Sequence, residues 1–188
     1  MKNQPFFRTY PLTIWNILTI IGYILLSTGL LYYYVYEPDP QRDYLLIYIL
    51  ATQMFLTSQY RAVRNLYMCL FWLLIGICHV VTAYFIKDIL LFQFPAGHLS
   101  VPMANTFILV LVMQVIRYIS LQLQGEEFVA PNRGGKDLFD ERKPTWVDFL
   151  CTGIYFTVLF LGMFAMPKRP VEKPKSEYII YLQRDSVK

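Results

Sequence analysis

The sequence predicts an all-α fold: a polytopic transmembrane helical bundle of about five spans, or four if the second does not cross. Composition is the first reason, because 56 % of the 188 residues are hydrophobic and 16 % are charged, against about 45–50 % and about 25 % in ordinary globular proteins. Patterning is the second, because residues 9–36, 66–86 and 89–116 contain no charged side chain. Each stretch is longer than the roughly 20 apolar residues that cross a bilayer core.

This composition excludes a soluble enzyme, a disordered regulator and a nucleic-acid-binding domain, so we expect no nucleic-acid partner. A β-barrel is excluded because barrel strands alternate over about 9–11 residues, whereas these runs are apolar throughout. The three cysteines fall in or beside apolar runs and are typical of small buried residues, not of a disulfide framework. We divide the chain into an amino-terminal tail, 1–11, a transmembrane bundle, 12–166, and a basic carboxyl-terminal tail, 167–188.

The first span is expected at about 12–36, where a run of apolar residues ends in four tyrosines. Tyrosine rings favour the headgroup region of a membrane. Small residues recur on one face of this span and of the third, and we predict that they form a helix-packing seam, within the chain or between chains. The residues of this predicted seam are Gly22, Gly29, Gly76 and Ala83.

The second span, about 44–60, is short and contains several polar residues, so it is the one that could fail to cross. The third, 66–86, is uninterrupted. An irregular stretch, 92–102, precedes the fourth span at about 101–121. We interpret this stretch as a loop, with a re-entrant segment as the alternative.

The fifth span, 146–166, follows a polar loop, 122–145. Asp148 lies near its start and could be taken for an intramembrane acid. Thr145 and Asp148 are spaced as in a capping box, in which both side chains satisfy backbone donors at a helix start. We therefore predict a capping role for this pair.

The positive-inside rule places the amino terminus in the cytoplasm. With five spans, the amino-terminal tail, the gap after the second span and the loop 122–145 share the inner side and carry most of the loop cations. The carboxyl-terminal tail, which carries six basic residues, then lies outside and conflicts with the rule. The prediction is a multi-pass integral membrane protein, and the sequence does not specify which membrane.

Four polar residues within spans form a candidate polar path, namely Gln53, His79, Gln114 and Arg117. His79 shares a stripe with small residues and should face another helix, either as a proton-relay or pore residue or as a neutral imidazole hydrogen-bonded across the interface. Arg117 either lines an aqueous path with Gln114 or extends its guanidinium to the headgroups. Gln53 is typical of a side chain that hydrogen-bonds a neighbouring helix.

The polar loop offers a candidate partner-docking surface formed by Arg133, Lys136, Leu138 and Phe139. Two glycines beside its basic residues could instead form a backbone nest for phosphate. A solvated loop with a short amphipathic turn is the simpler interpretation of the same residues.

No catalytic motif or metal-ligand spacing is recognised, so we expect no catalytic residue, no metal and no cofactor. Cys69 and Cys78 are nine residues apart, on opposite faces of one helix. One enzymatic interpretation remains: a lipid-modifying enzyme in which Asp88, His98 and the stretch 92–102 cluster at the membrane surface.

The leading hypothesis is a non-enzymatic scaffold or accessory subunit of a larger membrane complex or homo-oligomer. Its expected partners are membrane lipids and either other membrane-protein subunits or further copies of itself. The alternative is an oligomeric channel or transporter component whose polar path runs through His79, Gln114 and Arg117.

Overall fold

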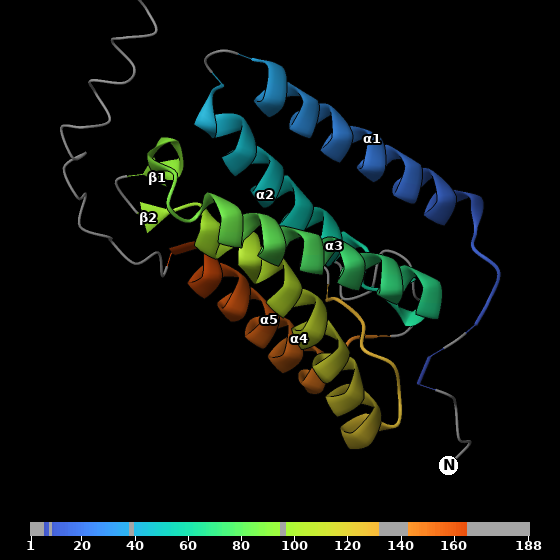
Figure 1. Ribbon diagram of the computed structural model, residues 1–188. Helices are drawn as coiled ribbons and strands as arrows, with labels where there is room; N and C mark the ends of the chain where they lie inside the picture. Colours follow the sequence, from blue (N-terminus) through green and yellow to red (C-terminus); the bar gives the residue numbers. More distant parts are fainter. Residues whose placement is uncertain (1–5, 8, 38–39, 95–96, 132–142, 165–188) are drawn as a thin grey trace, which may run out of the picture.

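The computed structural model describes residues 6–7, 9–37, 40–94, 97–131 and 143–164. In this part of the chain five α-helices form a bundle, accompanied by two short 3-10 turns and a two-stranded hairpin (Figure 1). The α-helices are α1 (Ile14–Tyr36), α2 (Arg42–Ser58), α3 (Leu66–Ile86), α4 (Ser100–Gln124) and α5 (Trp146–Phe164). The predicted fold class, an all-α membrane bundle, is confirmed.

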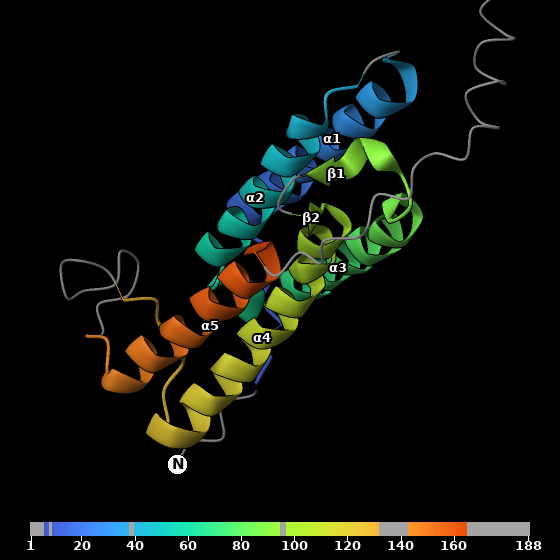
Figure 2. The ribbon, with the colours of Figure 1, turned by 90° about the vertical axis from the view of Figure 1, so that its left-hand side faces the viewer.

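Four of these helices, α1, α3, α4 and α5, are long and apolar enough to cross a membrane. They indicate an integral, multi-pass membrane protein. Helix α2 has 17 residues, which corresponds to about 26 Å, less than the roughly 30 Å of a hydrocarbon core. It nevertheless lies along the bundle beside α1, as two perpendicular views show (Figures 1 and 2).

Successive helices run in alternating directions (Figure 1). We call the end at which α1, α3 and α5 begin the first end, and the end at which α2 and α4 begin the second end. Because the number of helices is odd, α5 finishes at the second end, opposite the start of α1. The hairpin, β1 (Gln93–Phe94) paired antiparallel with β2 (Gly97–His98), lies at the second end immediately before α4.

Helices α3, α4 and α5 pack closely because small residues lie at their crossings. A Cβ atom added at Gly76 would lie 2.9 Å from the Cα of Phe107, so α3 and α4 approach backbone to backbone. A Cβ atom at Gly162 would lie within 2.0 Å of the Asn105 side chain. Ala83 is also buried. Small residues permit this close approach between helices in a membrane.

Helix α1 packs much less closely, since Tyr23 is the one residue of α1 that is buried. A Cβ atom built at Gly22 or Gly29 would have nothing within 4 Å. Among the described residues, these two members of the predicted seam therefore have open space beside them, and contact between chains stays a prediction.

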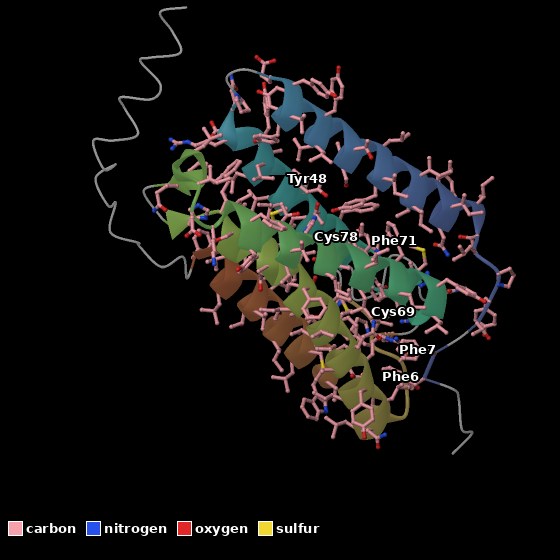
Figure 3. All side chains as sticks on the ribbon, in the orientation of Figure 1. Phe6, Phe7, Tyr48, Cys69, Phe71 and Cys78 are labelled. Atoms are coloured by element: carbon pink, nitrogen blue, oxygen red, sulfur yellow. The ribbon has the colours of Figure 1, made fainter. Side chains whose placement is uncertain are left out.

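The cysteines depart in part from the sequence prediction. Cys69 and Cys151 are buried, but Cys78 on α3 is exposed; Cys69 and Cys78 are labelled in Figure 3. The expectation of a buried residue was wrong for Cys78 because an apolar span in a bundle has a lipid-facing side as well as a packed side. All three thiols are free.

Candidate functional site

Polar side chains from four helices meet around His79. The stripe of α3 that carries His79 is buried, as its small neighbours predicted. We call the group the central cluster, and it consists of Tyr23, Ser27, Tyr48, Thr52, Gln53, His79 and Thr106. It joins α1, α2, α3 and α4 in the interior of the bundle.

On one side of the imidazole, two tyrosine hydroxyls approach Nε2. The Tyr48 hydroxyl lies 3.1 Å and the Tyr23 hydroxyl 3.3 Å from this nitrogen. The two hydroxyls are 2.7 Å apart, and that of Tyr23 is 3.0 Å from Thr52 Oγ1. Ser27 continues the chain of hydroxyls, 2.8 Å from the Tyr48 oxygen.

On the other side, Nδ1 of His79 lies 3.1 Å from Thr106 Oγ1 on α4. The Gln53 amide donates to the Pro102 carbonyl at 2.5 Å and to Thr106 Oγ1 at 3.4 Å. Gln53 thus connects α2 to the first turns of α4.

The chemistry of the central cluster is neutral. An uncharged imidazole has one donor and one acceptor nitrogen, and a hydroxyl can donate or accept. Either tautomer of His79 is therefore compatible with hydroxyls on both sides. No carboxylate or cation contributes to the hydrogen bonds described for His79.

A second polar group, the end cluster, surrounds Arg117 near the first end of the bundle. Its guanidinium makes five hydrogen bonds, to the Glu127 carboxylate twice, the Gln114 side chain and the backbone carbonyls of Val63 and Phe6, at 2.7–3.3 Å. A guanidinium has five N–H donors, so every donor of Arg117 has an acceptor. The phenyl ring of Phe6 lies against it, 4.6 Å from the guanidinium carbon (Figure 3).

Arg117 is 0 % exposed. The interpretation in which its side chain extends to the headgroups is therefore wrong. The guanidinium is turned into the protein, where acceptors from four segments of the chain replace the water and lipid phosphate that a headgroup-reaching Arg would contact.

Asp148 sits in the same end of the bundle and is also buried. Its carboxylate accepts from the backbone N–H groups of Thr145 at 2.8 Å and Val129 at 3.1 Å, and from Gln124 at 3.2 Å. The predicted capping role of Asp148 is confirmed. Thr145 differs from the prediction, because its hydroxyl lies within hydrogen-bond distance of the side-chain oxygens of Gln124 and Asp148 and donates its one proton there, not to a backbone group.

The structure brings together two pairs of the predicted path residues, Gln53 with His79 and Gln114 with Arg117. Thr106 and Arg117 are eleven residues apart on α4, about 16 Å along the axis. The buried α4 side chains between them include Leu109, Val110 and Met113. An apolar layer therefore lies between the central cluster and the end cluster.

No family model, curated protein or solved structure matches this chain. The two clusters must therefore be interpreted from their own chemistry.

His98, the focus of the enzymatic interpretation, is buried in the turn before α4. Its Nε2 lies 3.1 Å from the Ile89 carbonyl, and its Nδ1 accepts from the backbone N–H of Ser100 at 3.1 Å. Both ring nitrogens thus hold the turn together. Within the described ranges, no group of three His, Cys, Asp or Glu residues could hold a metal ion.

The candidate docking residues Arg133, Lys136, Leu138 and Phe139 lie outside the described residues, as does the carboxyl-terminal tail.

The sequence interpretation missed several members of both clusters. Tyr23 with Ser27 and Tyr48 with Thr52 are spaced i, i+4, a pattern that places two hydroxyls on one helix face and could have indicated the central cluster. Glu127 had no such signal, because it lies in the segment after α4 and meets Arg117 through a turn of the chain.

Proposed function

We propose that this protein is a non-enzymatic membrane subunit that associates with other membrane helices through α1, in a homo-oligomer or a larger complex. The observation that carries the proposal is the outer face of α1. Exposed residues recur there at spacings of four and three, namely Ile17, Ile21, Ile24, Thr28, Leu31 and Val35.

This spacing is the heptad pattern by which one helix packs along another. We call these six residues the outer stripe. At about 100° per residue, Gly22 and Gly29 lie roughly 120–140° around α1 from the centre of the outer stripe. Within its own chain α1 buries Tyr23 alone, so most of its surface is left for lipid or for another helix.

The interior polar groups support the same proposal. Arg117 has all five donors occupied, and His79 has a partner at each ring nitrogen. Polar side chains used in this way hold helices together. We therefore assign the interior to maintaining the bundle and the exterior to association.

Two measurements in mild detergent test the proposal. The native mass of the purified protein should exceed that of one chain. With Cys78→Ser removing the exposed thiol, Ile24→Cys should form disulfide-linked dimers if the partner is a second copy. Leu74→Cys, exposed on α3, is the matched control and should not. A monomeric mass without an Ile24→Cys cross-link would refute the proposal.

One observation favours a second candidate function, a channel or transporter component. Hydroxyls and the imidazole form a continuous chain from Ser27 to Thr106 across the bundle, and such chains can pass protons. Proton flux in liposomes should then be lower for His79→Ala than for the parent protein. The same flux measurement on Arg117→Ala tests the other half of the predicted path. Absence of flux in the parent protein would remove this candidate.

A further inference from the structure

Two cavities lie one after the other between α1 and α2. One is an apolar groove of about 570 Å³, within the range of small-molecule sites. Its lining includes Trp15, Leu18, Gly22, Leu26, Ala51 and Phe55. The open space beside Gly22 is part of this groove.

The other cavity lies at the first end of the bundle and is polar, with a volume of about 500 Å³. Its lining includes Tyr10, Asn16, Ser58, Arg61, Arg64 and Asn65. No carboxylate is found among the described residues that line it. The cavity therefore combines two guanidinium groups with neutral hydrogen-bonding side chains.

The two cavities are separate neighbours along α1 and α2. Trp15 lines the groove and the adjacent Asn16 lines the polar cavity. On α2, Phe55 lines the groove, and Ser58, less than one helical turn further on, lines the polar cavity. From Trp15 to Leu26 the groove follows α1 for about 16 Å, roughly half the thickness of a hydrocarbon core.

The charges at the polar cavity favour an anion. Arg61 is exposed in the α2–α3 connection. Arg64 is half-buried beside it, donates to the Phe128 carbonyl at 2.5 Å and lies 3.9 Å from Glu127. Basic side chains near a membrane surface attract anionic lipid headgroups.

We propose that α1 and α2 bind one anionic phospholipid, with its phosphate in the polar cavity at Arg61 and an acyl chain in the groove beside Gly22. The ligand must have both parts. A soluble anion would leave the apolar groove empty, and a zwitterionic lipid lacks the net charge that Arg61 would attract. The outer stripe lies on another face of α1, so this site is independent of the proposed association.

Native mass spectrometry of the full chain in mild detergent tests the proposal. The probes are phosphatidylglycerol and phosphatidylcholine with identical oleoyl chains, added in equal amounts. The parent protein should retain phosphatidylglycerol about fivefold more than phosphatidylcholine, the preference expected for one basic contact. Equal retention of the two lipids would overturn the proposal.

Two variants separate the parts of the site, each with a matched control. Arg61→Gln should abolish the preference for phosphatidylglycerol, whereas Arg42→Gln, at the second end of the bundle, should not. Gly22→Leu should fill the groove and reduce retention of both lipids. Gly29→Leu adds the same side chain at an equally open position outside the groove and should behave like the parent.

Two further outcomes would also overturn the lipid-binding proposal. If millimolar inorganic phosphate displaces the lipid, the site is a phosphate pocket and the two-part proposal is wrong. If Gly22→Leu changes the oligomeric mass and leaves lipid retention unchanged, a second copy occupies the groove and the proposal is likewise wrong.

Discussion

The central cluster and the end cluster place polar groups in the same apolar bundle by different means. In the central cluster, hydroxyl groups surround the neutral imidazole of His79, and the side chains come from four helices. Around Arg117 an ion pair with Glu127 is combined with backbone carbonyls from segments outside the helices. The first connects helix to helix, and the second connects helix α4 to the connecting segments.

The two clusters differ in how well they tolerate the loss of one side chain. A hydroxyl can rotate to a new acceptor when a neighbour is removed, so the central cluster has several alternative arrangements. A guanidinium cannot lose its charge, and its planar donors fit one set of acceptors. We therefore expect the end cluster to be much more sensitive to substitution than the central cluster.

The largest effect is expected for Arg117→Met. This change leaves two carbonyls without their donor and leaves Glu127 with Arg64 at 3.9 Å as its described cation. It should lower the free energy of unfolding by about 3–5 kcal/mol, as for other broken buried pairs. Thermal unfolding in detergent is the measurement. Lys143→Gln alters an exposed cation at the same end and should change the free energy by less than about 0.5 kcal/mol. Equal effects of the two substitutions would show that the buried guanidinium of Arg117 does not stabilise the bundle.

Asp148→Ala should come next. It removes an acceptor from buried donors that include the backbone N–H of Val129, and each unsatisfied donor costs about 1–3 kcal/mol. Asp43→Ala is the control, because Asp43 also lies in the first turn of a helix but is exposed. If both variants unfold at the same temperature, Asp148 does not hold the start of α5.

His79→Leu should have an intermediate effect of about 1–2 kcal/mol, the value for hydrogen bonds between membrane helices in model peptides. The hydroxyls of Tyr48 and Thr106 lose a shared partner but can turn to others. Loss of more stability than in Arg117→Met would reverse the ranking of the clusters.

Tyr48→Phe should have the smallest effect, about 0.6 kcal/mol. Combined with Tyr23→Phe, the loss should differ from the sum of the single losses, because the two hydroxyls are 2.7 Å apart and share acceptors. Tyr44→Phe, exposed on α2, is the control. Strict additivity would show that the hydroxyls act independently.

The sequence predicted the helices well because long apolar runs in a membrane have few alternatives to a helix. The third helix was predicted at 66–86 and is Leu66–Ile86. The burial of the His79 stripe was predicted too, since small residues mark a packed helix face. Each of these inferences rests on residues close together along the chain.

The end cluster was not predictable in this way. Two of the acceptors of Arg117 are backbone carbonyls, of Phe6 and Val63, 111 and 54 positions away. Every residue has such a carbonyl, so the sequence holds no sign of which ones are used. The sequence also gives no sign that Gly162 meets Asn105, because this contact depends on how α4 and α5 cross.

The partners of Arg117 have a consequence for the order in which the protein is assembled. They come from positions 6, 63, 114 and 127 of the chain, so the group is incomplete until the ribosome has passed residue 127. The first three helices leave the ribosome before that point. The segment at Phe6, although made first, is therefore among the last parts of the described chain to be fixed in place.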